Sequence, residues 1–485
     1  EDALSGALDI IAEEISDDAG IRRRLRVIAL SQGVVVSRAA KPDEDSVYSQ
    51  YYDYREPAAK IAGHRVLAID RGEREEFLKV SLELDQDKAM NIVNSVALKG
   101  PSPCYEAVSE AAQDAYTRLI FPSVERELRS TLSENAQEAA IKVFSVNLRN
   151  LLMQPPVKGK VAMGLDPGYR TGCKVAVVDA TGRVLDTGVI YPTHSQSRVQ
   201  EAKALVSRMI QKYQVEVIAI GNGTASKETE MFTAEVLSNL PQQDKERCAY
   251  MVVSEAGASV YSASKLAAEE FPQFDLTLRS AVSIARRLQD PLAELVKIDP
   301  KAIGVGQYQH DMPKKRLDEA LGGVVEDCVN NVGVDLNTAS PSLLERISGL
   351  SAAVSKNIVK YREENGAFTS RNELKQVNKL GPKAFVQCAG FLRVPESKNV
   401  LDNTGVHPES YGAAKELLKL CGFGEDDVKN GSLSGLADKV AALGEESVAQ
   451  QIGVGVPTLQ DIVKELLKPG RDPRDELPPP LLRTD

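Results

Sequence analysis

The sequence predicts a multidomain chain in which helical domains flank a single α/β domain. The chain has 485 residues, more than one hydrophobic core usually organises, so we expect three or more domains. Between residues 161 and 290, short β-branched runs alternate with helical patterns, which is typical of an α/β domain. The stretches on either side show helical periodicity almost throughout.

Composition limits the function classes. Hydrophobic residues make up 42% and charged residues 26% of the chain, and no apolar run approaches the ~18 residues of a membrane helix. The six cysteines and four histidines are dispersed without a CxxC pair, which argues against a zinc site or a disulfide scaffold and indicates the reducing cytoplasm. The net charge of -10 excludes uniform affinity for nucleic acid, so a phosphate-binding site needs a locally basic segment.

Residues 1–156 are predicted to form a helical region with a small β insertion near 64–84. We expect this insertion to consist of two strands that meet at an Arg71-Gly72 turn. A helix over 105–152 should follow and end at the pair of prolines behind it, because proline lacks the amide hydrogen that a helix needs.

Residues 157–313 are predicted to form the α/β domain. Apolar runs predict strands at 161–166, 173–179, 185–190, 215–221 and 250–253. Helical patterns lie near 197–213, 227–239, 262–269 and 279–289. The first strands are joined by short turns and the later ones through helices. We therefore expect an antiparallel opening and a parallel continuation, which suggests a ribonuclease-H-like sheet.

The remaining chain is predicted to be helical up to a terminal linker. Residues 314–395 should form a tandem helix-hairpin-helix domain and residues 396–468 a C-terminal helical domain. Residues 469–485 are rich in proline, which removes backbone donors and favours an extended linker.

Two segments, 343–366 and 373–394, repeat one plan of helix, short turn and second helix. A glycine-bearing turn exposes amide groups at the start of the second helix, where the helix dipole also favours an anion. A phosphate can dock there without any reading of base sequence. Residues 334–394 carry nine Lys and Arg against five acids, so this segment is basic within an acidic chain. We predict a nucleic-acid site at both turns, formed by Gly349, Leu350, Ser351, Lys356, Lys360, Lys379, Leu380, Gly381 and Lys383.

The alternative interpretation is that the hairpins only pack helices together and that their glycines are C-caps. Each turn retains one of the two glycines of the strict pattern, with Ser351 and Lys379 at the other positions. Lys379 is expected to add charge and Ser351 to restrict its turn. Residues 451–463, with Gly453 and Gly455, follow the same plan more weakly, and we interpret them as a structural turn.

Cleavage on a ribonuclease-H-like sheet requires several carboxylates around two metal ions ~4 Å apart. Asp166, at the end of the first strand, occupies the first expected position. The fourth strand leads instead to Asn222, whose neutral amide is a poor ligand for a hard cation. Asp290 is the best placed third acid. We predict a degenerate site without catalytic residues, metal or cofactor, and expect Mg²⁺ only if the chain is a nuclease after all.

Structural explanations for these acids stay open. Asp290 precedes Pro291, which suits the first position of a helix, so Asp290 is favoured as an N-cap. Asp166 alternatively shapes the turn that follows it. Glu294 and Asp311 are lesser candidates for the third acid. An acid/base role for His310-Asp311 is disfavoured, because adjacent loop residues rarely face one reacting atom.

Five segments carry a resemblance that covers nearly the whole chain in order. They are GLDPGYRTGCK (164–174), IAIGNGTASKETE (218–230), RRLQDPLAELVKIDPKAIGVGQYQHD (286–311), VGVDLNTASPSLLERISGLS (332–351) and VHPESY (406–411). Together they resemble the Tex family of bacterial transcription accessory proteins.

This resemblance implies a cytoplasmic nucleic-acid-binding protein with a helix-hairpin-helix pair and a YqgF-type ribonuclease-H-like domain that has lost cleavage. It also implies similarity to the core of a eukaryotic transcription elongation factor. Family members carry a further N-terminal helical region and a C-terminal OB-fold RNA-binding domain, both of which we expect this fragment to lack.

Three functions compete at this point. The favoured one is a non-catalytic scaffold of the transcription or translation machinery that binds the backbone of RNA or DNA. The second is a metal-dependent nuclease or resolvase built on Asp166 and Asp290. The third is a protein-interaction platform whose acidic surface meets a basic partner such as RNA polymerase or the ribosome.

Overall fold

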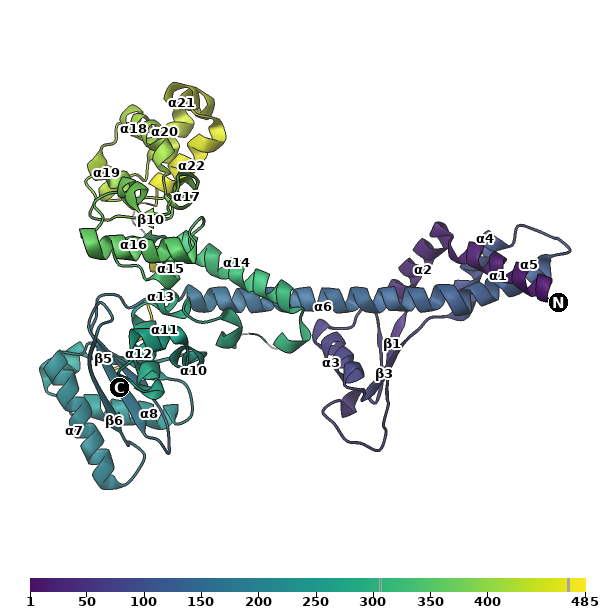
Figure 1. Ribbon diagram of the computed structural model, residues 1–485, viewed down its shortest axis with the longest axis horizontal. Coiled ribbons are helices and arrows are strands. Elements are labelled where there is room, and N and C mark those ends of the chain that lie inside the picture. Colours follow the sequence, from purple (N-terminus) through teal and green to yellow (C-terminus); the bar gives the residue numbers. More distant parts are fainter. Residues whose placement is uncertain (305, 307, 469–471) are drawn as a thin grey trace. The chain divides into compact units, whose positions relative to one another are not determined.

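The computed structural model describes residues 1–304, 306, 308–468 and 472–485 (Figure 1). Internal contacts divide the chain into two compact units. The first unit comprises Glu1–Ser145 with Gly306–Asp318, and the second comprises Val146–Val305 with Glu319–Asp485.

The first unit packs helices around a small antiparallel sheet. Its helices are α1 (Asp2–Ser16), α2 (Ala19–Gln32), α3 (Gly63–Arg74), α4 (Gln86–Ala97), α5 (Tyr105–Asp114) and the N-terminal part of α6 (Phe121–Leu152). The strands β1 (Val34–Ala39), β2 (Asp53–Pro57) and β3 (Leu78–Glu83) lie in the order β2-β1-β3. A helical turn, Ala115–Ile120, joins α5 to α6. The prediction of helical structure over 105–152 is therefore confirmed.

The predicted pair of strands around Arg71-Gly72 is wrong. This segment is helix α3, and only β3 follows where the second strand was expected. Val66 and Ile69 are buried at helical spacing. Gly72 lies inside this helix. A side chain there would clash, because its Cβ would lie 2.5 Å from the Leu78 side chain. The glycine therefore allows close packing and does not mark a turn.

The second unit begins with a five-stranded mixed sheet. Its strands are β4 (Ala162–Asp166), β5 (Cys173–Val178), β6 (Val184–Ile190), β7 (Val217–Gly221) and β8 (Ala249–Val253), in the order β6-β5-β4-β7-β8. β4 pairs antiparallel with β5, and β5 pairs antiparallel with β6, whereas β4-β7 and β7-β8 are parallel. The predicted ribonuclease-H-like arrangement is confirmed.

Helices cover both faces of this sheet. The helices of the domain are α7 (Gln196–Tyr213), α8 (Ser226–Ser238), α9 (Gln242–Arg247), α10 (Ala258–Ser262), α11 (Lys265–Glu270), α12 (Leu276–Gln289) and α13 (Pro291–Leu295). Val206 of α7 and Val236 of α8 pack against one face, and Ile284 of α12 packs against the other. Helix α12 lies very close to β4, since a Cβ on Gly164 would lie 2.1 Å from the Ala281 carbonyl oxygen.

Helical hairpins make up most of the remaining chain. After α14 (Lys314–Val332), the hairpin domain, residues 334–394, contains α15 (Pro341–Leu344), α16 (Ala352–Asn365), a short helical turn at Arg371–Gln376 and α17 (Pro382–Cys388). Its two ends meet where β9 (Val334–Asp335) pairs in parallel with β10 (Leu392–Arg393). The C-terminal helices, within residues 400–466, are α18 (Tyr411–Leu420), α19 (Glu425–Lys429), α20 (Leu436–Leu443), α21 (Glu445–Ile452) and α22 (Val456–Leu466).

A buried arginine joins the hairpin domain to the C-terminal helices. The Arg371 side chain is 1% exposed and lies within hydrogen-bond distance of backbone carbonyls from both. Its acceptors are the carbonyls of Leu392 (2.7 Å), Leu401 (3.1 Å), Val406 (2.8 Å) and Thr404, and the Tyr411 hydroxyl (2.9 Å). The Leu401 carbonyl also accepts from the Thr404 hydroxyl (2.7 Å), but removal of the guanidinium would take this donor away from the other buried carbonyls.

Residues 472–485 are docked onto the α/β domain, whereas the sequence predicted an extended linker. Arg483 exchanges two backbone hydrogen bonds of 2.8 Å with Tyr250 of β8. The Tyr250 hydroxyl donates to the Asp485 carbonyl (2.8 Å), and Leu482 packs against the core of the sheet. Proline prevents a long strand here, but a single bridge to an edge strand remains possible. Residues 469–471 of the predicted linker lie outside the described residues.

Over the part of the chain that the structure describes, no helix combines the length and the apolar character that crossing a membrane requires.

Arg371→Met is expected to lower the free energy of unfolding of the hairpin region by about 3 to 5 kcal/mol, because it removes every donor of a buried guanidinium. Native-state hydrogen exchange of residues 371–411 measures this loss. Arg170→Met, at an exposed position, is the control and should stay within about 0.5 kcal/mol. Equal effects of the two variants would contradict the role of Arg371.

Candidate nucleic-acid interface and the acidic corner of the α/β domain

Asp166 ends β4, where the chain turns through Pro167-Gly168 toward β5. The pKa of this carboxyl is raised to about 6, mainly by burial and also by the Glu255 carboxylate, while Lys174 opposes the shift. The second of these causes shows that another negative charge lies near Asp166.

Glu255 supplies that second charge, and the sequence analysis missed it. It lies two residues beyond the end of β8, and its amide donates to the Asn222 side-chain oxygen (3.0 Å). A Cβ on Gly223 would lie 1.8 Å from the Glu255 Oε1 atom, so glycine leaves room for this carboxylate. The available signal was positional: the carboxyl ends of parallel strands meet at one edge of a sheet, and Glu255 follows such a strand.

A buried cation also reaches this corner of the sheet. Arg287 of α12 is 5% exposed, and its Nη1 donates to the carbonyls of Ser254 (2.9 Å) and Ala256 (2.7 Å), on either side of Glu255. Burial lowers the pKa of Arg287, while the Glu294 and Glu255 carboxylates oppose that shift. The guanidinium therefore holds the loop that carries Glu255.

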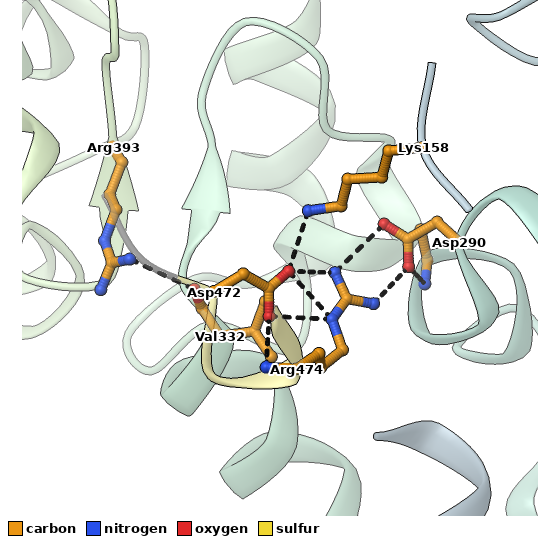
Figure 2. A network of polar contacts seen from close by, with 7 residues as sticks. Lys158, Asp290, Val332, Arg393, Asp472 and Arg474 are labelled. Carbon is orange, nitrogen blue, oxygen red and sulfur yellow. Dashed lines mark hydrogen bonds and ion pairs between the residues drawn. The ribbon is translucent and has the colours of Figure 1, made fainter. Parts of the chain in front are cut away.

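Asp290 belongs to a different cluster, drawn in Figure 2. Its side chain accepts from the Ala293 amide (3.2 Å), so the predicted N-cap is confirmed. It also pairs with Arg474 (2.6 Å), which in turn pairs with Asp472 (2.6 Å). Burial alone would raise the pKa of Asp472, but hydrogen bonds from Arg474 and Lys158 lower it to about 2. Asp290 thus anchors the segment that begins at Asp472.

The lesser acidic candidates are engaged in ion pairs. Asp311, buried in the first unit, pairs with Arg71 (2.6 Å) and Arg74 (2.9 Å), which leaves it no part in an acid/base pair with His310. Glu294 pairs with Lys297 (3.0 Å). Among the described residues, no group of three or more His, Cys, Asp or Glu could hold a metal ion. Two carboxylates beside an arginine do not fit a site for two divalent cations.

The first hairpin turn leads into α16 through a left-handed residue and an extended N-cap. Gly349 has a left-handed backbone (φ +85°), and Ser351 is the extended N-cap of α16, with its hydroxyl accepting from the Val354 amide (3.3 Å). Ser351 therefore fits the turn without restricting it. Helix geometry leaves the amides of Ala352 and Ala353 without acceptors inside α16, so they remain for an anion.

The second turn repeats this geometry with other residues. Lys379 takes the left-handed position (φ +65°) of Gly349, and Gly381 is the extended N-cap before Pro382. A left-handed conformation is unfavourable for lysine and is enforced here by the surrounding turn. The Asn357 side chain donates to the Asn378 carbonyl (3.0 Å), which ties this turn to α16.

Leu350 and Leu380, predicted to lie in the interface, instead anchor the turns. Their side chains are buried, and their amides donate within the turns to the carbonyls of Ile347 (3.1 Å) and Val377 (3.2 Å). The predicted lysines are exposed: Lys356 and Lys360 on α16, Lys379 in the second turn and Lys383 on α17. The structure thus separates the predicted residues into buried anchors and exposed cations.

The turn at Gly453 and Gly455, interpreted above as structural, has the same backbone as the two predicted sites. Gly453 is left-handed (φ +75°) and Gly455 is the extended N-cap of α22. A related turn, with Gly422 left-handed (φ +78°) and Gly424 as N-cap, precedes α19. The three acids in the first turn of α19 would repel a phosphate there.

Comparisons with known proteins agree with this organisation. Family models match the chain as the Tex central region over residues 1–144, the Tex protein YqgF-like domain over 160–289, a helix-hairpin-helix motif over 329–393 and an HHH domain over 399–474. The match to an HHH domain covers the turn at Gly453 and Gly455, which supports the interpretation of this turn as part of a further helix-hairpin-helix motif. Fold and turns together define a multidomain helix-hairpin-helix protein with a ribonuclease-H-like domain.

Individual relatives are similar over almost the entire chain. The Uncharacterized protein YdcI of Bacillus subtilis is 51% identical over 489 residues, which cover 100% of this chain and 67% of the relative. The Protein tex of Bordetella pertussis is 42% identical over 490 residues (98% and 61%), and the Transcriptional accessory protein Tex of Neisseria gonorrhoeae is 44% identical over 480 residues (97% and 62%). The chain belongs to the Tex family, and it spans 61% to 67% of the length of these relatives.

Asp166→Asn is expected to stabilise the protein in a pH-dependent way. The pKa of Asp166, about 6 in the folded protein, lies above the ~3.9 of an unfolded aspartate. The folded state therefore holds this proton more tightly, and stability falls as the pH rises from about 4 to 6. The variant should exceed wild type by about 2 kcal/mol at pH 8 and by much less at pH 4. Urea unfolding with EDTA at both pH values measures this, and a difference independent of pH would contradict it.

Proposed function

We propose that this chain is a non-catalytic nucleic-acid-binding scaffold of the transcription machinery. It would bind the phosphate backbone of RNA or DNA, without sequence specificity, at the turns of the hairpin domain. The observation that carries this proposal is the pair of turns with one backbone geometry, at Gly349–Ser351 and Lys379–Gly381, beside exposed lysines. Backbone amides at a helix start recognise a phosphate and no base.

The names of the relatives support the cellular setting. One is called a transcriptional accessory protein, and we infer the same role for this chain in the cytoplasm. RNA polymerase or the ribosome is the proposed partner complex, since the net charge of -10 favours contact with a basic protein surface.

Affinity for a labelled oligonucleotide should fall steeply with salt, by about 100-fold between 50 and 200 mM if about four phosphates are contacted. Lys379→Glu combined with Lys383→Glu should lower the affinity at least about tenfold for DNA and RNA alike, since both lysines flank the second turn. Fluorescence anisotropy at the two salt concentrations measures both effects.

Lys415→Glu combined with Lys419→Glu is the matched control, since both lysines are exposed on α18. It changes the net charge by the same amount away from the turns. Equal losses in the two double variants, or unchanged affinity in both, would remove the hairpins from this account.

A nuclease remains the second candidate, because Asp166 and Glu255 do bring two carboxylates to one edge of the sheet. We propose that the chain does not cleave, since Arg287 holds the Glu255 loop and Asp290 lies in the cluster around Arg474.

Incubation of the protein with branched DNA and structured RNA, with Mg²⁺ or Mn²⁺, is expected to leave both substrates intact on a denaturing gel. Asp166→Asn and Glu255→Gln serve as controls against contaminating nucleases. Cleavage that both variants abolish would establish the second candidate and end the non-catalytic proposal.

A further inference from the structure

Residues 480–485, which we call the arm, lie along the open edge of the α/β sheet. β8 is an outer strand of this sheet, whose order is β6-β5-β4-β7-β8. The arm pairs antiparallel with β8 through one bridge, in which Tyr250 and Arg483 exchange two backbone hydrogen bonds of 2.8 Å. An outer strand presents a row of backbone donors and acceptors, so it can accept a further strand.

Two apolar residues of the arm face the α12 side of the sheet. Pro480 lines a cavity of about 150 Å³ together with Met251 and Val253 of β8. Leu482 packs against the core cluster that contains α12 and these two β8 residues. A spacing of two positions places side chains on one face of a strand.

The alternate residues of the arm face the other side. Leu481 is 87% exposed. Arg483 pairs with Glu230 of α8 (2.6 Å), and α8 packs on the face of the sheet opposite to α12. The arm therefore has both the backbone pairing and the side-chain alternation of a sixth strand, although it forms one isolated bridge.

The arm is held more weakly than the segment from which it extends. Arg474 is 2% exposed, and its guanidinium is enclosed by Asp472 and Asp290 (Figure 2). The Arg483 side chain is 64% exposed, and an exposed ion pair contributes little to stability because water and salt screen it. Few buried contacts and few hydrogen bonds favour local opening. The arm can therefore leave β8 while Arg474 keeps the segment attached.

The open edge offers more pairing positions than the arm uses. Alternate residues of β8 direct their backbone groups to β7, as does Val253, whose carbonyl accepts from the Asn222 amide (3.0 Å). Tyr250 directs its groups to the arm instead. Val252, two positions further on, points to the same edge as Tyr250 by strand geometry. A strand that pairs with both residues forms two bridges where the arm forms one.

We propose that the edge of β8 is a docking site for an extended strand of a partner protein, and that the arm occupies this site until such a strand replaces it. The partner strand carries an apolar residue directed to α12, as Leu482 is, followed by Lys or Arg beside Glu230. Strand addition to a sheet edge derives its affinity from main-chain hydrogen bonds and its specificity from alternate side chains. The inference goes beyond the proposed function, since it does not depend on nucleic-acid binding.

The probe is a fluorescein-labelled peptide of residues 478–485, titrated against the full chain by anisotropy in the absence of nucleic acid. In wild type the tethered arm competes at a high effective concentration, so the peptide should bind weakly. Leu482→Asp releases the arm and should raise the affinity for the peptide about tenfold, because it increases the fraction of chains with an open edge. Leu481→Asp is the matched control, since the same change falls on the exposed neighbour; it should behave as wild type.

Glu230→Lys, combined with Leu482→Asp, tests the position of the strand. It should reverse the preference between the native peptide and one that carries Arg483→Glu, because the charge facing the peptide changes sign. Hydrogen exchange of residues 477–485 verifies that Leu482→Asp releases the arm.

Four results would overturn the inference: an arm that stays protected in Leu482→Asp, equal affinities of Leu482→Asp and Leu481→Asp, no binding of the peptide by any variant, or a preference that Glu230→Lys leaves unchanged. Because no nucleic acid is present in these titrations, each of these results leaves the proposed function as it stands.

Discussion

The packing of the C-terminal helices on the hairpin domain depends on one buried guanidinium. Arg371 lies in the hairpin domain, and its acceptors include carbonyls of the stretch that leads to α18. That stretch also carries His407, whose Nε2 atom donates to the Val386 carbonyl of α17 (2.7 Å), so a second polar contact links the two parts. Apolar contacts alone would allow sliding, because the hydrophobic effect has no direction. Hydrogen bonds from a planar, rigid donor fix the relative position of the two parts.

The α/β domain brings two carboxylates and one buried arginine to the same corner of its sheet. The sheet retains the strand order and Asp166 at the end of β4, and Glu255 reaches the same corner. The helix that packs on β4 contributes Arg287 to this corner. Two negative charges with one buried positive charge form a structural cluster more readily than a binding site for two divalent cations. The cluster around Arg474 meanwhile attaches the C-terminal segment to the same domain (Figure 2).

Local patterns predicted much of this architecture, and long-range contacts limited the rest. The five strands of the α/β domain and the hairpins at Gly349 and Gly381 follow from periodicity and turn residues. Helix α3 was missed because its apolar residues form one short run, 66–69, which does not distinguish a strand from a helix, and because Arg71-Gly72 was interpreted as a turn. Glu255 gave no local signal, since its role depends on which strands become neighbours. Residues 472–485 seemed a linker because Asp290, which pairs with Arg474, and Tyr250, which pairs with Arg483, lie more than a hundred positions away in sequence.

Hydrogen–deuterium exchange with and without an oligonucleotide tests the central claim most directly, because it reports contact over the whole chain at once. The account predicts slower exchange in residues 345–355 and 377–388, with no change at 164–174 or 251–257 whether or not Mg²⁺ is present. Slower exchange confined to the segments around Asp166 and Glu255, above all if it requires Mg²⁺, would contradict the account and place the nucleic acid at the corner of the α/β sheet.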